Sequence, residues 1–288
     1  MPLLEISGML DPILDKYGVP RWTKSYIIAY ARKNPTLLIK HGLSFIDIKR
    51  KKGSITKEQV YLPNGIKFDM DFVNEILAQF YYGEQRLSEI YKNWANDPAH
   101  PEHEYREGFM HLSMLAKKHM RAIKNIMDGL SFKSIGPNEG AKEMFDFISN
   151  VHEKNERIIT SGLLLKYMYS RTFGIIFYRV FYPTAPEFMR SFGKVFIKDT
   201  KATSWLKEKT NALLSTGDKE EILEFTRFAI GKMISCINTE VPNAKKSNIE
   251  NEFLLLRDIS IAYPLHMLNE SGFNIDPDQE TAKILKNL

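Results

Sequence analysis

The sequence predicts a mostly helical fold, in which a bundle of long helices follows a small β-containing segment. One reason is the hydrophobic period, which is close to two over residues 43–70 and close to 3.6 from Asp71 to the C-terminus. Another is length and composition: 288 residues with 43% hydrophobic and 26% charged side chains suffice for a sizeable core. We therefore divide the chain into an N-terminal α+β segment, 1–70, and a helical bundle, 71–288.

The N-terminal segment opens with two short helical pieces, "DPILDKYG" and "TKSYIIAYARKN". The alternating stretch after them contains two turn signals, Lys52-Gly53 and Asn64-Gly65. Asn-Gly is typical of a type I′ turn, so it predicts a β-hairpin within a small meander. The expected strands carry Val60, Leu62, Ile66 and Phe68.

The helical part is divided by prolines, glycines and polar clusters. The expected helices cover about 71–95, 104–128, 139–181, 184–215, 218–239 and 248–270. Thr184 and Glu187 have the spacing of a capping box, and Gly272 follows the last expected helix. Helices of this length joined by short connections predict a bundle.

Charge and cysteine content give weaker guidance. The 40 basic and 35 acidic residues leave a net charge of +5, a mild excess for a chain of this length. A single cysteine, Cys236, excludes an intrachain disulfide framework. Acidic residues stand near the N-terminus where a secretory signal would carry lysines, and no segment reaches eighteen uncharged apolar residues. We expect a soluble, cytoplasmic protein without a membrane partner.

Four ionisable residues fall on or near the apolar stripes of the expected helices, where an unpaired charge is costly to bury. They are Glu84, His119, Glu156 and Asp199. Glu84 lies about 12 residues before the end of its helix and His119 about 15 after the start of the next. In an antiparallel pair these positions differ by roughly 4.5 Å of helical rise. Glu84 and His119 are therefore expected to face each other.

This helix order, with a glutamate followed by a histidine at the same level of the next helix, resembles the ferritin-like superfamily over about residues 71–215. The resemblance is to the ribonucleotide reductase small subunit and the bacterial multicomponent hydroxylases. It implies a Glu-x-x-His motif on the second and fourth helices and single carboxylates on the first and third. Glu84 matches the first carboxylate and His119 the motif histidine. The helices over 218–270 are then additions to the ferritin-like core.

The chain departs from that family pattern at several ligand positions. Ala116 replaces the glutamate of the second-helix motif, and Thr200 and Thr203 stand where the fourth-helix motif is expected. The third helix has Lys166 and no acid near the expected level. A two-metal site needs several carboxylates and two imidazoles, so the resemblance implies a degenerate di-iron site.

Two other clusters carry alternative chemistry. "HPEHEYREGFMH" brings His103, Glu107 and His111 close in sequence, a pattern for zinc or for local ion pairs at a helix start. A basic turn can contact phosphates. It consists of Lys49, Arg50, Lys51, Lys52 and Lys57. Phosphate-binding glycine loops, Rossmann fingerprints and nucleophile elbows do not occur in the sequence.

The favoured function is a non-catalytic binding or scaffolding subunit that meets a protein partner or its own copies through the bundle surface and needs no cofactor. The alternative is a metal-dependent oxygenase or hydroxylase that holds iron or manganese with an altered ligand set. Its ligands would be Glu84, His119, Glu156 and Asp199. A third hypothesis is nucleic-acid binding through the basic turn.

Overall fold

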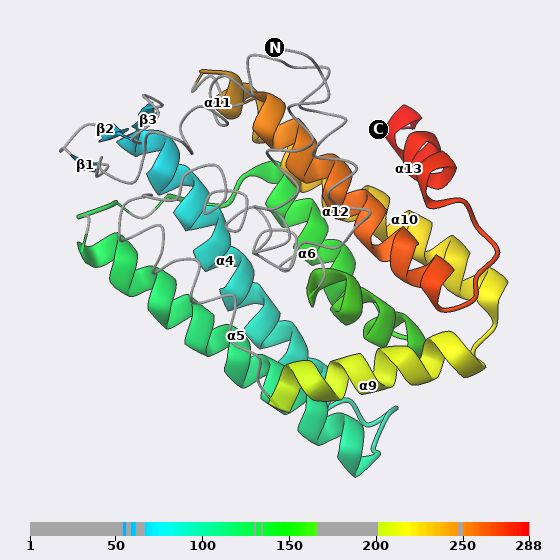
Figure 1. Cartoon of the computed structure of the whole chain (residues 1–288). Helices are drawn as coiled ribbons and strands as arrows, with labels where there is room; N and C mark the ends of the chain where they lie inside the picture. The colour runs from blue at the N-terminus through cyan, green and yellow to red at the C-terminus, as the bar shows by residue number, and fades with distance from the viewer. Residues whose placement is uncertain are drawn as a thin grey trace.

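The computed structural model describes residues 54–55, 59–61, 67–129, 131–133, 135–165, 201–246 and 250–287. This described part is mostly helical (Figure 1). Its strands are β1 (Ser54–Ile55), β2 (Gln59–Tyr61) and β3 (Lys67–Asp69). Its helices are α4 (Met70–Ala95), α5 (His103–Gly129), α6 (Glu139–Ser149), α9 (Lys201–Thr216), α10 (Lys219–Asn238), α11 (Val241–Lys246), α12 (Glu250–Glu270) and α13 (Pro277–Lys286). Residues 154–165 are also helical.

The three strands form an antiparallel sheet in the order β1-β2-β3. Val60 pairs with Phe68 and Tyr61 with Lys67. A two-residue turn at Asn64-Gly65 would instead place Tyr61 opposite Phe68. The described register leaves an odd number of residues between paired positions, whereas the two-residue turn leaves an even number. The described register therefore does not match the expected two-residue turn at Asn64-Gly65, and residues 62–66 themselves lie outside the described part.

α4 and α5 form an antiparallel pair at one edge of the molecule (Figure 1). Their boundaries agree with the expected helices to within one residue. The apolar faces pack on each other; the buried positions include Leu87, Ile90, Trp94, Phe109, Leu112 and Ala116. Between the helices, the Asp97 carboxylate accepts a hydrogen bond from the backbone N–H of Ala99 at 2.9 Å. This turn lets the chain reverse at Pro98.

The prediction of one continuous helix over 139–181 is wrong, because the helix is interrupted after Ser149. α6 ends at Ser149, and a new helical segment begins at residue 154. The backbone N–H of Asn150 bonds to carbonyls of the last α6 turn, at Asp146 and Phe147, which closes the helix. Ile148, Val151 and Ile158 are all buried across the break. The apolar pattern therefore continues although the helix stops, so periodicity could not reveal the interruption.

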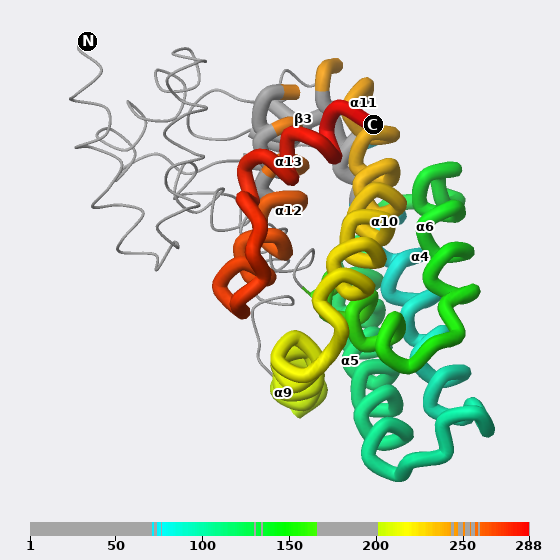
Figure 2. The backbone as a smooth tube through the Cα atoms, turned by 90° about the vertical axis from the view of Figure 1, so that its right-hand side faces the viewer, coloured from blue at the N-terminus to red at the C-terminus, as the bar shows by residue number. Residues whose placement is uncertain are grey.

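The C-terminal half adds helices on the other side of the molecule. α10 lies between α6 and α12, and α9 crosses α5 at one end (Figure 2). Asp218 and Asp276 are the N-caps of α10 and α13, and each carboxylate accepts two backbone N–H bonds. Gly272 follows α12 with φ +85°, the left-handed conformation that glycine adopts without strain. α11 and α13 were not expected from the sequence.

In the described residues, no helix is long and apolar enough to cross a membrane. The expected capping box at Thr184 and Glu187, and the start of the helix expected over 184–215, lie outside the described part. The C-terminal part of that expected helix is present as α9, which ends at Thr216.

Candidate functional site

The centre of the α4–α5 interface holds Glu84 and His119. Both residues are buried, with 4% and 6% of their surface exposed, and Nδ1 of His119 lies 3.4 Å from Oε1 of Glu84. The expectation that these side chains face each other is confirmed. Ala116, one turn before His119, is buried as well. The position at which the ferritin-like resemblance would place a glutamate is therefore occupied by a methyl group inside the core.

Other polar groups continue along this interface, one turn further along α4. Oγ of Ser113 donates to the Ser88 carbonyl at 2.7 Å, and the two hydroxyls are 3.3 Å apart. Tyr91 follows, and burial raises the pKa of its phenol far above the usual range. The nearby Ser161 hydroxyl lowers that pKa, and the charge of Glu84 raises it. Glu84 and His119 therefore lie at one end of a buried row of polar side chains.

The remaining metal-ligand candidates do not join this pair. Glu156 is half-buried in helical residues 154–165, and its pKa is raised by burial and then by the charges of Glu153 and Glu221. Asp199 lies outside the described residues. Within the described part, no three His, Cys, Asp or Glu side chains are grouped so that they could hold a metal ion.

The cluster at the start of α5 has the geometry of a solvated helix end. Nε2 of His103 lies 3.7 Å from Oε1 of Glu107, with both side chains largely exposed. Lys154 binds Glu102 at 2.6 Å, and His111 is exposed. These contacts correspond to the local ion-pair alternative. The basic turn of Lys49, Arg50, Lys51, Lys52 and Lys57 lies outside the described residues.

Sequence reasoning missed a buried arginine, Arg157, at the end of the α4–α5 interface. The side chain of Arg157 is only 3% exposed, and its Nη2 donates to Oδ2 of Asp97 at 2.5 Å. Its Nε donates to the Val151 carbonyl at 3.3 Å, and its guanidinium lies 5.4 Å from the Trp94 ring centroid. The sequence gives no signal for it, because Arg157 occupies an ordinary position beside two isoleucines.

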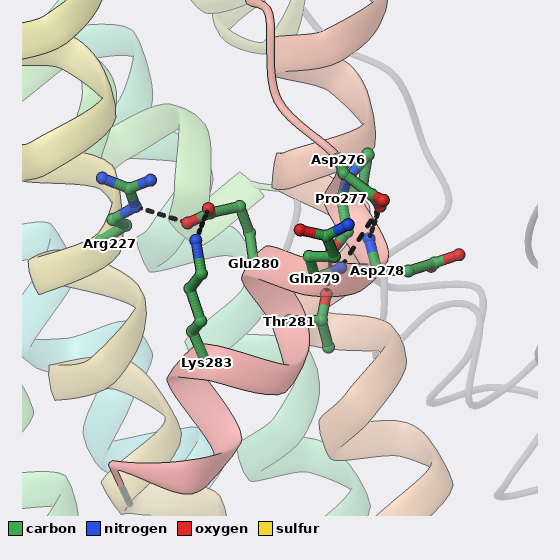
Figure 3. A network of polar contacts seen from close by, with 8 residues as sticks. All are labelled: Arg227, Asp276, Pro277, Asp278, Gln279, Glu280, Thr281 and Lys283. Carbon is green, nitrogen blue, oxygen red and sulfur yellow. Dashed lines mark hydrogen bonds and ion pairs between the residues drawn. The ribbon is translucent and has the colours of Figure 1, made fainter.

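A second group of polar residues lies where α13 packs near α10 (Figure 3). Glu280 is buried and accepts from Nε of Arg227 at 2.6 Å and from Nζ of Lys283 at 2.8 Å. Burial raises the pKa of Glu280, but the hydrogen bonds from Lys283 and Arg227 outweigh this effect and hold that pKa below its usual range. This group was missed because no helix was expected beyond Gly272.

The surface groove beside Glu280 is lined by an exposed aromatic side chain. Phe228 is 54% exposed, and its ring makes an edge contact with Phe147 of α6 at 5.5 Å between centroids. Nζ of Lys232 lies 5.6 Å from the Phe228 ring. The groove is lined by Glu143, Glu224, Arg227, Phe228, Gly231, Lys232, Ser235, Glu280, Lys283, Ile284 and Asn287. Its charged lining residues are three acids and three bases.

The fold and these sites define a mostly helical protein with a buried acid–histidine pair in its core and a mixed-charge aromatic groove on its surface. The chain matches no family model, and no curated protein or solved structure is significantly similar to it.

Proposed function

We propose that this chain is a non-catalytic scaffolding bundle of ferritin-like type, in which Glu84 and His119 form a structural pair. The observation that carries the proposal is the burial of both side chains against each other, 5% and 8% exposed and 3.4 Å apart. A catalytic or metal-activating group needs room for substrate or water beside it. Ala116 reinforces the proposal, because its buried methyl group supplies no ligand.

The competing hypothesis is a metal-dependent oxygenase. A carboxylate and an imidazole 3.4 Å apart are two suitable ligands for iron or manganese, so the same pair also supports this alternative. That site would need Glu156, Asp199 or other groups to complete the coordination. The two hypotheses differ in what a metal ion does to stability, since an ion that binds the folded state raises its melting temperature.

The test is metal analysis of the purified protein together with thermal melts of wild type and His119→Leu, each with and without Fe(II), Mn(II) or Zn(II). His111→Leu is the matched control, because His111 is an exposed histidine on the same helix. We expect no bound metal and no metal-dependent shift in any of the three proteins. A shift in wild type and His111→Leu that disappears in His119→Leu would establish the metal site and refute the proposal.

The scaffolding role is supported by the groove around Phe228. Aromatic and arginine side chains dominate the binding energy of protein interfaces, and both line this groove. A two-fold interface pairs a surface patch with its own copy. Charges within such a patch are matched when both signs are present, and the groove contains three acids and three bases. The partner proposed for the groove is a second copy of this chain.

Light scattering coupled to size-exclusion chromatography tests the self-association. Phe228→Asp replaces the exposed aromatic side chain of the groove by a charge, so we expect wild type to run as a dimer and this variant as a monomer. Met114→Asp is the control, because Met114 is also a well-exposed apolar residue, at 61%, on a different helix. A monomeric wild type at micromolar concentration, or a dimer that resists Phe228→Asp, would contradict this part of the proposal.

A further inference from the structure

The exposed side of α5 carries a stripe of positive charge. Between Gly108 and Met127 the helix contains no Asp or Glu. Lys117, Lys118, Arg121 and Lys124 are all exposed within this stretch. We propose that this basic stripe, residues 117–124 of α5, binds the phosphate backbone of duplex nucleic acid.

Three of the four charges of the stripe have no acidic partner in the described part of the chain. Lys124 lies 3.1 Å from Asp128. Lys117, Lys118 and Arg121 form no ion pair with any acid in the described part of the chain. The neighbouring stretch of α4, residues 76–83, contains no acidic residue either. At this level of the two packed helices, Asp128 is paired with Lys124 and Glu84 is buried against His119, so neither carboxylate is paired with Lys117, Lys118 or Arg121.

The spacing of the stripe suits a polyphosphate. Lys117, Arg121 and Lys124 are separated by four and three residues, so they project from one side of the helix over about 10 Å. Duplex DNA carries one charge per about 1.7 Å of its axis, so a segment of this length presents roughly six phosphates. Contacts of this kind position a protein on nucleic acid without reading its sequence.

A membrane surface is the main competing anionic partner, and the packing of α5 argues against it. A helix that lies in a membrane interface inserts a free apolar face among the lipids. The apolar face of α5 is already used, since Phe109, Leu112, Ala116 and Ile123 are buried in the core. α5 lies along the outer edge of the bundle (Figure 1), and its basic side chains are exposed. Nucleic acid is thus the favoured partner.

This inference goes beyond the scaffolding proposal and is independent of it. Metal content and dimerisation concern the core pair and the groove, whereas the stripe belongs to the exposed side of α5. Failure of one experiment would therefore leave the others interpretable.

Fluorescence anisotropy of the full chain with a labelled RNA duplex and a labelled DNA duplex tests the proposal. For three phosphate contacts, affinity should fall about 40-fold between 50 and 200 mM salt. The variant Lys117→Ala, Lys118→Ala, Arg121→Ala should lose most of this salt dependence and bind much more weakly. Alanine favours helix at these exposed positions, so the fold should be retained, and circular dichroism checks this.

The matched control is Lys92→Ala, Lys207→Ala, Lys286→Ala, which removes the same net charge from exposed sites on three other helices. We expect this control to bind the duplexes nearly as wild type does. Equal losses in both triple variants would mean that net charge alone drives binding, and would overturn the proposal. Binding to anionic lipid vesicles but not to either duplex, or no binding to either duplex at 50 mM salt, would also overturn it.

Discussion

Trp205 of α9 lies directly against Gly108 of α5, so closely that a Cβ atom on Gly108 would be 2.1 Å from Cε2 of the indole. The ring also makes edge contacts with Tyr105 and Phe109, at 6.0 and 5.4 Å between centroids. The absence of a side chain at Gly108 therefore allows α9 to cross α5 at this point.

Gly108→Ala should consequently destabilise the fold. Overpacking costs about 1–3 kcal/mol, which outweighs the gain of about 1 kcal/mol in helix propensity. Urea denaturation measures the change in the free energy of unfolding. Gly231→Ala is the control, because no atom lies within 4 Å of a Cβ there, and it should stabilise the protein by about 0.5–1 kcal/mol. If both variants were stabilised, the close crossing of α9 over α5 would be wrong.

The Asp97–Arg157 ion pair predicts an acid-sensitive contribution to stability. The hydrogen bond from the Ala99 backbone and then that from Arg157 lower the pKa of Asp97 below its ordinary value of 3.8. The unfolded chain therefore takes up this proton at higher pH than the folded protein does. The stabilisation is present above about pH 4 to 5 and is lost as the pH falls through the lowered folded-state pKa.

Asp97→Asn should flatten the fall in stability below about pH 5 and lower stability at neutral pH, because Arg157 stays buried without its counter-charge. Chemical denaturation at a series of pH values measures both effects. Asp128→Asn, which removes an exposed carboxylate from α5, is the comparison and should leave the profile close to that of wild type. Identical profiles for wild type and Asp97→Asn would exclude this role for the ion pair.

A double-mutant cycle at Glu84 and His119 measures the coupling of the core pair. Either Glu84→Leu or His119→Leu alone leaves a buried polar group without its counterpart, at a cost of about 1–3 kcal/mol. The double variant removes both groups and should cost less than the sum, with a coupling energy of about 0.5–3 kcal/mol. Strict additivity of the two changes would show that the contact at 3.4 Å contributes nothing to stability.

The N-cap of α10 provides a local test. Oδ1 of Asp218 accepts from the backbone N–H groups of Glu220 and Glu221 at 2.9 and 3.0 Å. Asp218→Ala should lower the free energy of unfolding by about 1 kcal/mol, whereas Asp218→Ser keeps a capping oxygen and should cost much less. Equal losses in thermal or urea denaturation would indicate that the carboxylate acts through something other than capping.

The facing of Glu84 and His119 could be predicted because it depends on local quantities. Helix boundaries and a rise of about 1.5 Å per residue set the level of each side chain, and a short connection makes the helices antiparallel. Asp97 was not recognised as part of the site, because its partner Arg157 is 60 residues away. No periodic or spacing rule relates residues across such a separation.

The sequence by itself determined the helical character of the described part, the ends of α4, α5 and α10, and the placement of a glutamate and a histidine on the apolar sides of neighbouring helices. These features follow from periodicity, capping and turn residues, which act within a few positions along the chain. Only the tertiary structure decided that α6 stops at Ser149 while the following residues remain buried. It also decided that Glu280 of α13 accepts hydrogen bonds from both Arg227 and Lys283. The crossing of α9 over α5 at Gly108 was likewise decided by the tertiary structure. Those features depend on how distant segments pack, because burial and ion pairing are properties of the neighbours that the fold brings together.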